Sequence, residues 1–223
     1  MPAVDAMDVK IVPTITTDDP NKFQYYMTEY PKFAKRIHLD IMDGTFVQNK
    51  TVQISAIVQF PAEIKVDIHL MAANPSAHLE HILRLKPYTC FLHAEAGENI
   101  LPVFEQLKAA GIKCGLVLLQ KTNPGVVKEY IQNAQSVIIF AGTLGAQGGK
   151  ADMLQTEKVK MIRSINPGCE VCWDGGANLS NVRALAHNDI NIINVGSFIA
   201  TAEDPSVAFG QLIEEKSKRG VVL

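Results

Sequence analysis

Short apolar runs alternate along the whole chain with longer segments of mixed polarity. Eight runs rich in Val, Ile and Leu have the length and composition of buried strands. These predicted strands cover residues 9–13, 36–40, 64–70, 89–93, 113–118, 136–140, 170–174 and 190–195. Because both faces of each run are apolar, the strands belong in a parallel sheet that is covered on both sides.

The segments between the runs have the periodicity of amphipathic helices. Apolar residues recur there at intervals of three and four, which predicts helices within residues 75–85, 100–110, 152–165 and 178–186. Asn74-Pro75 and Asp204-Pro205 mark helix starts, and Ala110-Gly111 marks a helix end. Strands and helices therefore alternate from one end of the chain to the other.

Eight strand-helix units account for all 223 residues. An open doubly wound sheet is disfavoured, because no G-x-G-x-x-G motif follows the run at residues 9–13. The α/β pattern therefore predicts one closed (β/α)8 TIM barrel that forms a single domain over residues 1–223.

Composition and charge exclude several classes of protein. The chain is 47% hydrophobic, with 21 Lys and Arg against 23 Asp and Glu. A formal net charge of -2 gives no electrostatic reason to expect nucleic acid or an anionic membrane as a partner. No apolar run approaches the roughly 20 residues of a membrane span, and the start lacks the pattern of a signal peptide, so we expect a cytoplasmic protein.

Four cysteines raise the question of a disulfide or a zinc site. Cys169 and Cys172 have C-x-x-C spacing, whereas Cys90 and Cys114 stand singly in separate apolar segments. No second C-x-x-C completes a zinc site. We therefore predict free, buried thiols.

Polar residues gather at the predicted carboxyl ends of strands, where TIM barrels carry their chemistry. His38 and Asp40 are two residues apart on one strand and so point the same way. His69 and Asp174 end two other strands. Two imidazoles and two carboxylates suit Zn, Fe, Mn or Co, and inward charges without a partner are costly. These four residues predict a metal site.

Other histidines are less clearly assigned. His93 and Glu95 end a further strand, and either they support the metal site or they form an ordinary ion pair. His78, His81 and His187 lie in helical segments and are predicted to be surface or packing residues.

Glycine-rich loops follow the last three strands. Phosphate in barrels is usually bound by the loops after strands seven and eight, here residues 175–178 and 196–200. Residues 142–149, after strand six, form a candidate lid. Each loop taken alone is equally compatible with simple tight turns.

Five motifs in order resemble those of the ribulose-phosphate 3-epimerases. They are HLDIMDGTFV at 38–47, DIHLM at 67–71, LHAEA at 92–96, WDGG at 173–176 and VGS at 195–197. The resemblance extends over residues 10–204. It implies a barrel of the ribulose-phosphate-binding type.

The resemblance also implies a site and a reaction. His38, Asp40, His69 and Asp174 are the implied ligands of one divalent ion, either Zn, Fe(II), Mn or Co. Asp40 and Asp174 are implied as acid and base on opposite faces of a ketose phosphate, inverting C3 and interconverting D-ribulose 5-phosphate and D-xylulose 5-phosphate. A homo-oligomer is implied as well. The implied substrate contacts are Thr14, Met42, Met71, Gly145, Ala146, Gln147, Gly175, Gly176, Gly196 and Ser197.

The chain departs from the family pattern most after the sixth strand. IIFAGTLGAQ at 138–147 replaces Met-Thr-Val-x-Pro-Gly-Phe-x-Gly-Gln, so one methionine is absent and the lid is rebuilt. Thr14 replaces a serine, and Gln48 replaces a proline. Two alternatives stay open: a non-catalytic sugar-phosphate binder, and a lyase like orotidine-phosphate decarboxylase or hexulose-phosphate synthase. Lys65 and Asp67 lack the spacing of the lyase motif Asp-x-Lys-x-x-Asp.

Overall fold

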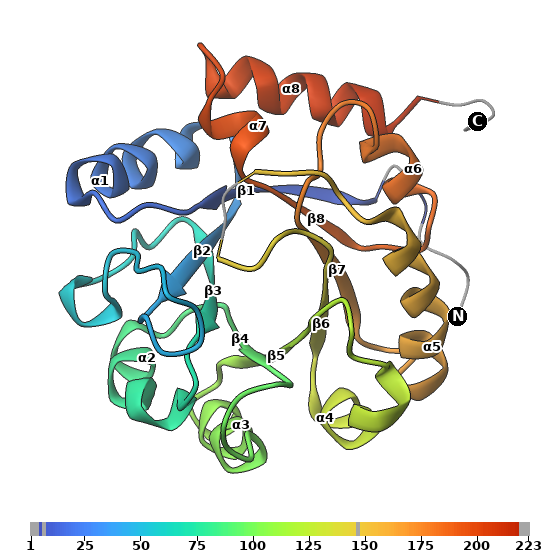
Figure 1. Ribbon diagram of the computed structural model, residues 1–223. Helices are drawn as coiled ribbons and strands as arrows, with labels where there is room; N and C mark the ends of the chain where they lie inside the picture. Colours follow the sequence, from blue (N-terminus) through green and yellow to red (C-terminus); the bar gives the residue numbers. More distant parts are fainter. Residues whose placement is uncertain (1–4, 6–7, 146–147, 219–223) are drawn as a thin grey trace.

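Eight parallel strands close into a barrel in the computed structural model, which describes residues 5, 8–145 and 148–218. Figure 1 views this barrel along its axis. The strands pair in chain order, and β8 closes the barrel against β1. Their bounds are β1 Lys10–Ile15, β2 Arg36–Met42, β3 Lys65–Met71, β4 Thr89–His93, β5 Lys113–Leu118, β6 Ser136–Phe140, β7 Glu170–Asp174 and β8 Ile192–Val195. The predicted TIM barrel is confirmed, and β4 to β7 have the predicted bounds.

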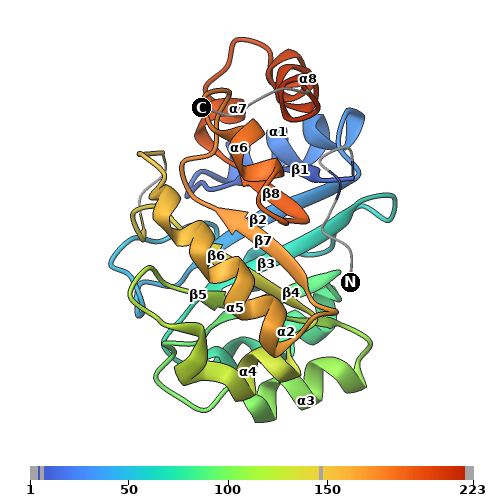
Figure 2. The same cartoon turned by 90° about the vertical axis from the view of Figure 1, so that its right-hand side faces the viewer.

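Helices surround the strands on the outside of the barrel (Figures 1 and 2). They are α1 Pro20–Glu29, α2 Leu79–Leu85, α3 Leu101–Ala109, α4 Lys128–Asn133, α5 Lys158–Ile165, α6 Val182–Ala186, α7 Ser197–Ala200 and α8 Pro205–Lys216. Between β2 and β3 the chain makes only a short 3-10 turn, η2 Ile54–Ala56. The short helix α7 lies directly after β8, at the carboxyl end of the barrel.

The predicted helix start at Asp204-Pro205 is confirmed. Asp204 accepts hydrogen bonds from the backbone N–H groups of Ser206 and Val207, so α8 begins at Pro205. The segments at 75–85 and 152–165 instead open with the 3-10 turns η3 Pro75–His78 and η5 Met153–Glu157.

The helix predicted over residues 178–186 is shorter than expected. The Asn178 side chain accepts hydrogen bonds from the backbone N–H and hydroxyl of Ser180, which holds this stretch in a turn. Helix α6 therefore begins only at Val182.

Two apolar layers hold the barrel together. Alternate strand residues pack outward against the helices or inward toward the axis. On β4, Cys90 and Leu92 belong to the outer layer, whereas Phe91 points inward. A Cβ at Gly115 on β5 would lie 2.2 Å from the Phe91 ring, so glycine is needed beside this phenylalanine. The inner layer comprises Val12, Phe91, Val117, Ile138, Phe140, Cys172 and Ile192.

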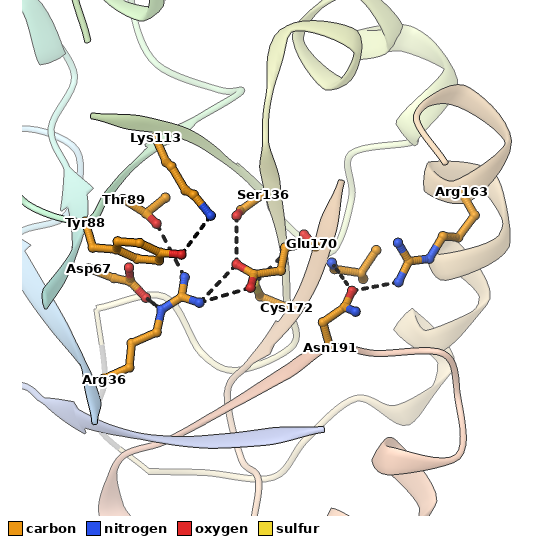
Figure 3. Close-up of polar contacts among 11 residues, drawn as sticks. Arg36, Asp67, Tyr88, Thr89, Lys113, Ser136, Arg163, Glu170, Cys172 and Asn191 are labelled. Atoms are coloured by element: carbon orange, nitrogen blue, oxygen red, sulfur yellow. Dashed lines mark hydrogen bonds and ion pairs between the residues drawn. The ribbon is translucent and has the colours of Figure 1, made fainter. Parts of the chain in front are cut away.

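An ion network lies below this inner layer, at the amino ends of the strands (Figure 3). Arg36 donates from Nε to Asp67 Oδ2 at 2.6 Å and from Nη1 to both carboxylate oxygens of Glu170 at 3.1 and 3.0 Å. The Tyr88 ring lies 4.9, 4.4 and 4.5 Å from the cationic groups of Arg36, Lys65 and Lys113. We call this set the floor network. The inward-pointing Asp67 thus has Arg36 as its ion-pair partner and is not among the four residues placed to hold a metal ion, although it pairs in register with His38.

The four cysteines are free and buried, as the sequence predicts. Burial raises the pKa of the Cys90 and Cys172 thiols above the usual value. Within the described residues, the group of side chains placed to hold a metal ion contains no cysteine. No helix in the described part of the chain is long and apolar enough to cross a membrane.

Candidate active site and metal centre

Four side chains from three strands converge at the carboxyl end of the barrel. His38 and Asp40 come from β2, His69 from β3 and Asp174 from β7. One ligand atom from each lies within 4.8 Å of the others. His69 Nδ1 is 3.1 Å from Asp40 Oδ1 and 3.4 Å from Asp174 Oδ2. His38 Nε2 is 3.5 Å from Asp40 Oδ1 and 3.6 Å from Asp174 Oδ2.

The donor set fits a divalent metal ion. His38 and His69 are fully buried, and each carboxylate residue is only 8% exposed. Within the described residues, neither ring nitrogen of His38 has a hydrogen-bond partner. An unsatisfied buried polar atom costs about 1–3 kcal/mol, which coordination would offset at Nε2. Two nitrogens and two oxygens are a donor set of Zn, Fe, Mn and Co sites.

The electrostatics of the cluster also favour a cation. Burial alone would raise the pKa of Asp174. The imidazoles of His38 and His69 lower that pKa by more than burial raises it, so the net shift is downward. Burial lowers the pKa of His69, whereas the Asp174 and Asp40 carboxylates raise it to about 9. The two carboxylates therefore create a strongly negative potential at the point where the ligand atoms meet.

Asp40 is held in place by residues outside the predicted set. Thr16 Oγ1 donates to Asp40 Oδ2 at 2.6 Å, which leaves Oδ1 facing the imidazoles. The backbone carbonyl of Asp40 accepts from Thr51 Oγ1 at 2.9 Å. Thr16 was not predicted from the sequence. The available signal was its spacing: Thr16 lies two residues after Thr14, next to the end of β1, so the two side chains point the same way.

His93 contacts the metal site directly. Its Nε2 lies 2.9 Å from Nε2 of His69, and its Nδ1 lies 3.6 Å from Glu95 Oε2. Burial lowers the pKa of His93 to about 4, so this imidazole is neutral at pH 7. Of the two alternatives for this pair, the structure favours support of the metal site. His78 instead pairs with Asp43 at 3.0 Å.

The candidate site opens into a pocket at the barrel mouth. Glycines from the loops after β6, β7 and β8 line it, and so do side chains at the strand ends. Predicted substrate contacts among the lining residues are Thr14, Met42, Met71, Gly145, Gly175, Gly176, Gly196 and Ser197. Ala146 and Gln147 lie outside the described residues. The pocket is also lined by Thr16, Phe140, Gly142, Gly148, Ala177 and Asn194, which are not among the predicted substrate contacts. Of these, Gly142, Gly148 and Ala177 belong to the predicted glycine-rich loops.

Two glycines after β7 permit close packing of the mouth loops. Gly175 and Gly176 have φ angles of 110° and 68°, which disfavour other residues. A Cβ would lie 2.2 Å from the nitrogen of Gly142 at position 175, and 2.3 Å from that of Ala151 at position 176. The backbone after β7 therefore lies directly against the segment that follows β6.

The segment after β6 (yellow in Figure 1) lies over the barrel mouth. Asn49 Nδ2 donates a hydrogen bond to the carbonyl of Gly145, which links this segment to the loop after β2. Phe140, at the end of β6, lines the pocket, and its ring lies 6.2 Å from that of His69. The rebuilt sixth unit thus places an aromatic ring beside the site.

Comparison with known proteins identifies the family. The model of the "Ribulose-phosphate 3 epimerase family" matches residues 10–200. The chain belongs to this family. A ribulose-phosphate 3-epimerase of Helicobacter pylori (strain J99 / ATCC 700824) is 28% identical, with 90% of this chain and 94% of the relative covered. One from Aquifex aeolicus (strain VF5) is 27% identical, with 77% and 80% covered.

Among solved structures, 3-hexulose-6-phosphate synthase from Salmonella typhimurium has a TM-score of 0.71 at 12% identity, with 93% of this chain and 98% of that chain covered. That likeness shows a shared barrel fold. Family membership places the chain among isomerases that act on carbohydrate phosphates, which confirms the enzyme class predicted from the motifs.

Proposed function

We propose that this protein is a metal-dependent epimerase that inverts C3 of a ketose phosphate, with D-ribulose 5-phosphate and D-xylulose 5-phosphate as its substrate pair. The observation that carries the proposal is the pairing of Asp40 and Asp174. They come from β2 and β7 and meet at one cluster of ligand atoms. Two carboxylates from separate strands suit proton removal on one face and proton return on the other.

His38, Asp40, His69 and Asp174 would hold the divalent ion, whether Zn, Fe(II), Mn or Co. Such an ion would supply Lewis-acid chemistry: it would polarise the carbonyl of the substrate and so make the C3 proton more acidic.

The acid and base steps belong to the protein. One aspartate takes the proton from C3, and the electrons of the C–H bond move toward C2, giving an enediolate of the sugar. The other aspartate enters the step as the neutral acid, delivers its proton to the opposite face of C3 and becomes a carboxylate, while the first aspartate keeps the proton taken from C3. In the reverse reaction the two roles exchange. Burial of both carboxylates excludes the bulk water that would otherwise solvate them.

The phosphate group would lie against the loops after β7 and β8. The pocket lining described here contains no Lys or Arg, so neutral N–H donors would bind the phosphate. Gly175, Gly176 and Gly196 let the ligand approach these backbone groups closely, and Ser197 adds a hydroxyl.

The position of Lys65 argues against the lyase alternative. Lys65 begins β3 at the amino end of the barrel, and its ammonium lies over the Tyr88 ring. Asp67 is bound to Arg36. Neither residue lines the pocket that contains Asp40 and Asp174.

Solvent isotope exchange tests the proposal. Purified protein loaded with Mn, Zn or Fe(II) is mixed with ribulose 5-phosphate in deuterated water, and C3 is followed by NMR. Deuterium at C3 together with xylulose 5-phosphate is the expected result. Metal-loaded protein that binds the sugar phosphate without deuterium incorporation would instead be a non-catalytic binder, and the proposal would fail.

A further inference from the structure

We propose that His93 and Glu95 are positioning residues for the metal ligand His69. Together they form a chain of polar contacts that fixes the tautomer and orientation of its imidazole. The inference rests on the proposed metal site, and it assigns a task to two residues that do not line the pocket.

The two ring nitrogens of His69 have different surroundings. Nδ1 faces the carboxylates, 3.1 Å from Asp40 Oδ1 and 3.4 Å from Asp174 Oδ2. Nε2 faces away from them and lies 2.9 Å from Nε2 of His93. A metal held by this ring would therefore bind at Nδ1, and the ring proton would then reside on Nε2.

This arrangement sets the direction of the next bonds. Because His69 donates from Nε2, His93 accepts at its own Nε2 and carries its proton on Nδ1. That Nδ1 lies 3.6 Å from Glu95 Oε2, an ion-pair contact longer than a hydrogen bond. Neither atom has a hydrogen bond among the described residues, so the carboxylate is available to the Nδ1 proton. A histidine ligand whose second nitrogen donates to such a chain is a stronger and better oriented ligand.

The far end of the chain is fixed to the scaffold. Glu95 Oε1 accepts hydrogen bonds from the backbone N–H of Leu119, at 3.0 Å, and from the hydroxyl of Thr122. Lys158 on α5 donates to the carbonyl of Leu119 at 2.7 Å, holding the same turn. The positioning chain thus connects the ligand on β3, through β4, to the turn after β5.

Packing restricts His93 to this orientation. The ring is fully buried, stacks on His69 with ring centroids 5.0 Å apart, and lies 4.5 Å from the Phe46 ring. A simple surface ion pair between His93 and Glu95 would require neither the burial nor the contact with His69.

Metal affinity of the purified protein tests the inference. His93→Phe keeps an aromatic ring and removes the acceptor, so we expect Co(II) and Mn(II) to bind about tenfold to hundredfold more weakly. The visible spectrum of the Co(II) protein should change with it. His93→Gln offers an amide oxygen in place of Nε2 and should restore most of the affinity and the spectrum. His78→Gln alters a histidine that pairs with Asp43 outside the site, and should bind metal like the wild type.

Wild-type affinity and spectrum in His93→Phe would overturn the inference. If that variant fails to fold, Glu95→Gln decides instead: weaker Co(II) binding with a changed spectrum supports the chain, and unchanged values refute it. Isotope exchange on the wild type tests the epimerase proposal separately. A wild-type protein that binds metal without exchange would fail as an epimerase and leave the affinity result standing.

Discussion

The hydroxyl of Thr16 donates a 2.6 Å hydrogen bond to Oδ2 of Asp40. The other carboxylate oxygen of Asp40 faces His69 at 3.1 Å, so the two contacts together fix the plane of the group. A catalytic carboxylate that is held on both oxygens keeps its orientation throughout the reaction, which proton transfer at a fixed carbon requires.

Thr16→Val should therefore slow epimerisation while leaving the fold intact. A hydrogen bond to a charged group contributes about 1.5–3 kcal/mol, which corresponds to a rate loss of roughly tenfold or more. Thr16→Ser keeps the hydroxyl and should retain most of the rate. Steady-state kinetics on ribulose 5-phosphate measure both variants, and an unchanged kcat in Thr16→Val would show that this bond is dispensable.

Asp40→Asn and Asp174→Asn should each abolish exchange at C3. An amide neither accepts the C3 proton nor returns one, and general acid or base groups contribute about 10²–10⁴-fold to rates. Asp43→Asn is the matched control, since Asp43 contacts Thr45 and His78 outside the pocket. NMR in deuterated water measures all three variants. A wild-type exchange rate in either of the first two removes that aspartate from the acid and base pair.

Arg36→Met should destabilise the barrel through the floor network. The substitution leaves Asp67, which is 1% exposed, as a buried charge without its guanidinium partner. Breaking a buried pair in this way costs about 3–5 kcal/mol. Urea denaturation gives the free energy of unfolding. Lys32→Met removes a surface pair with Glu29 and should change it by less than about 1 kcal/mol. If the two substitutions changed the free energy of unfolding equally, the floor network would not have the stabilising role assigned to it here.

Tyr88 should ionise at a lower pH than an ordinary tyrosine. The hydrogen bond from Lys113 lowers the pKa of Tyr88, and the nearby charges of Lys113, Lys65 and Arg36 reinforce this, because cations favour the phenolate. When the pH is raised, absorbance at the phenolate band should show an early component, meaning an increase that begins at a lower pH than for an ordinary tyrosine. Tyr88→Phe should remove it, and Lys113→Met should move it to higher pH. An early component that survives Tyr88→Phe would contradict the prediction.

The sequence contained enough information for the barrel and for the four His and Asp residues that cluster at its mouth. Strands such as Ser136–Phe140 are apolar on both faces, and the two-residue spacing of His38 and Asp40 places them on one side of β2. Both signals are local in the chain, so they can be interpreted without a structure.

Contacts that depend on the register between strands were not predictable. Thr16 and Asp40 are 24 residues apart, and Arg36 and Glu170 are 134 apart. The role of His93 depends on how β3 and β4 align, since His69 pairs in register with Phe91. Sequence spacing gives no measure of that alignment, and therefore left the His93–Glu95 pair with two interpretations.

The inner apolar layer around Phe91 fills much of the barrel interior. The floor network lies on one side, and the ligand cluster lies on the other, with the Phe91 ring 5.9 Å from that of His38. Apolar side chains neither donate nor accept protons, so this layer provides no proton relay toward the bottom of the barrel. In the proposed reaction, a proton removed from the sugar would then leave the site past the glycines that line the barrel mouth, so those loops would govern its exchange with solvent.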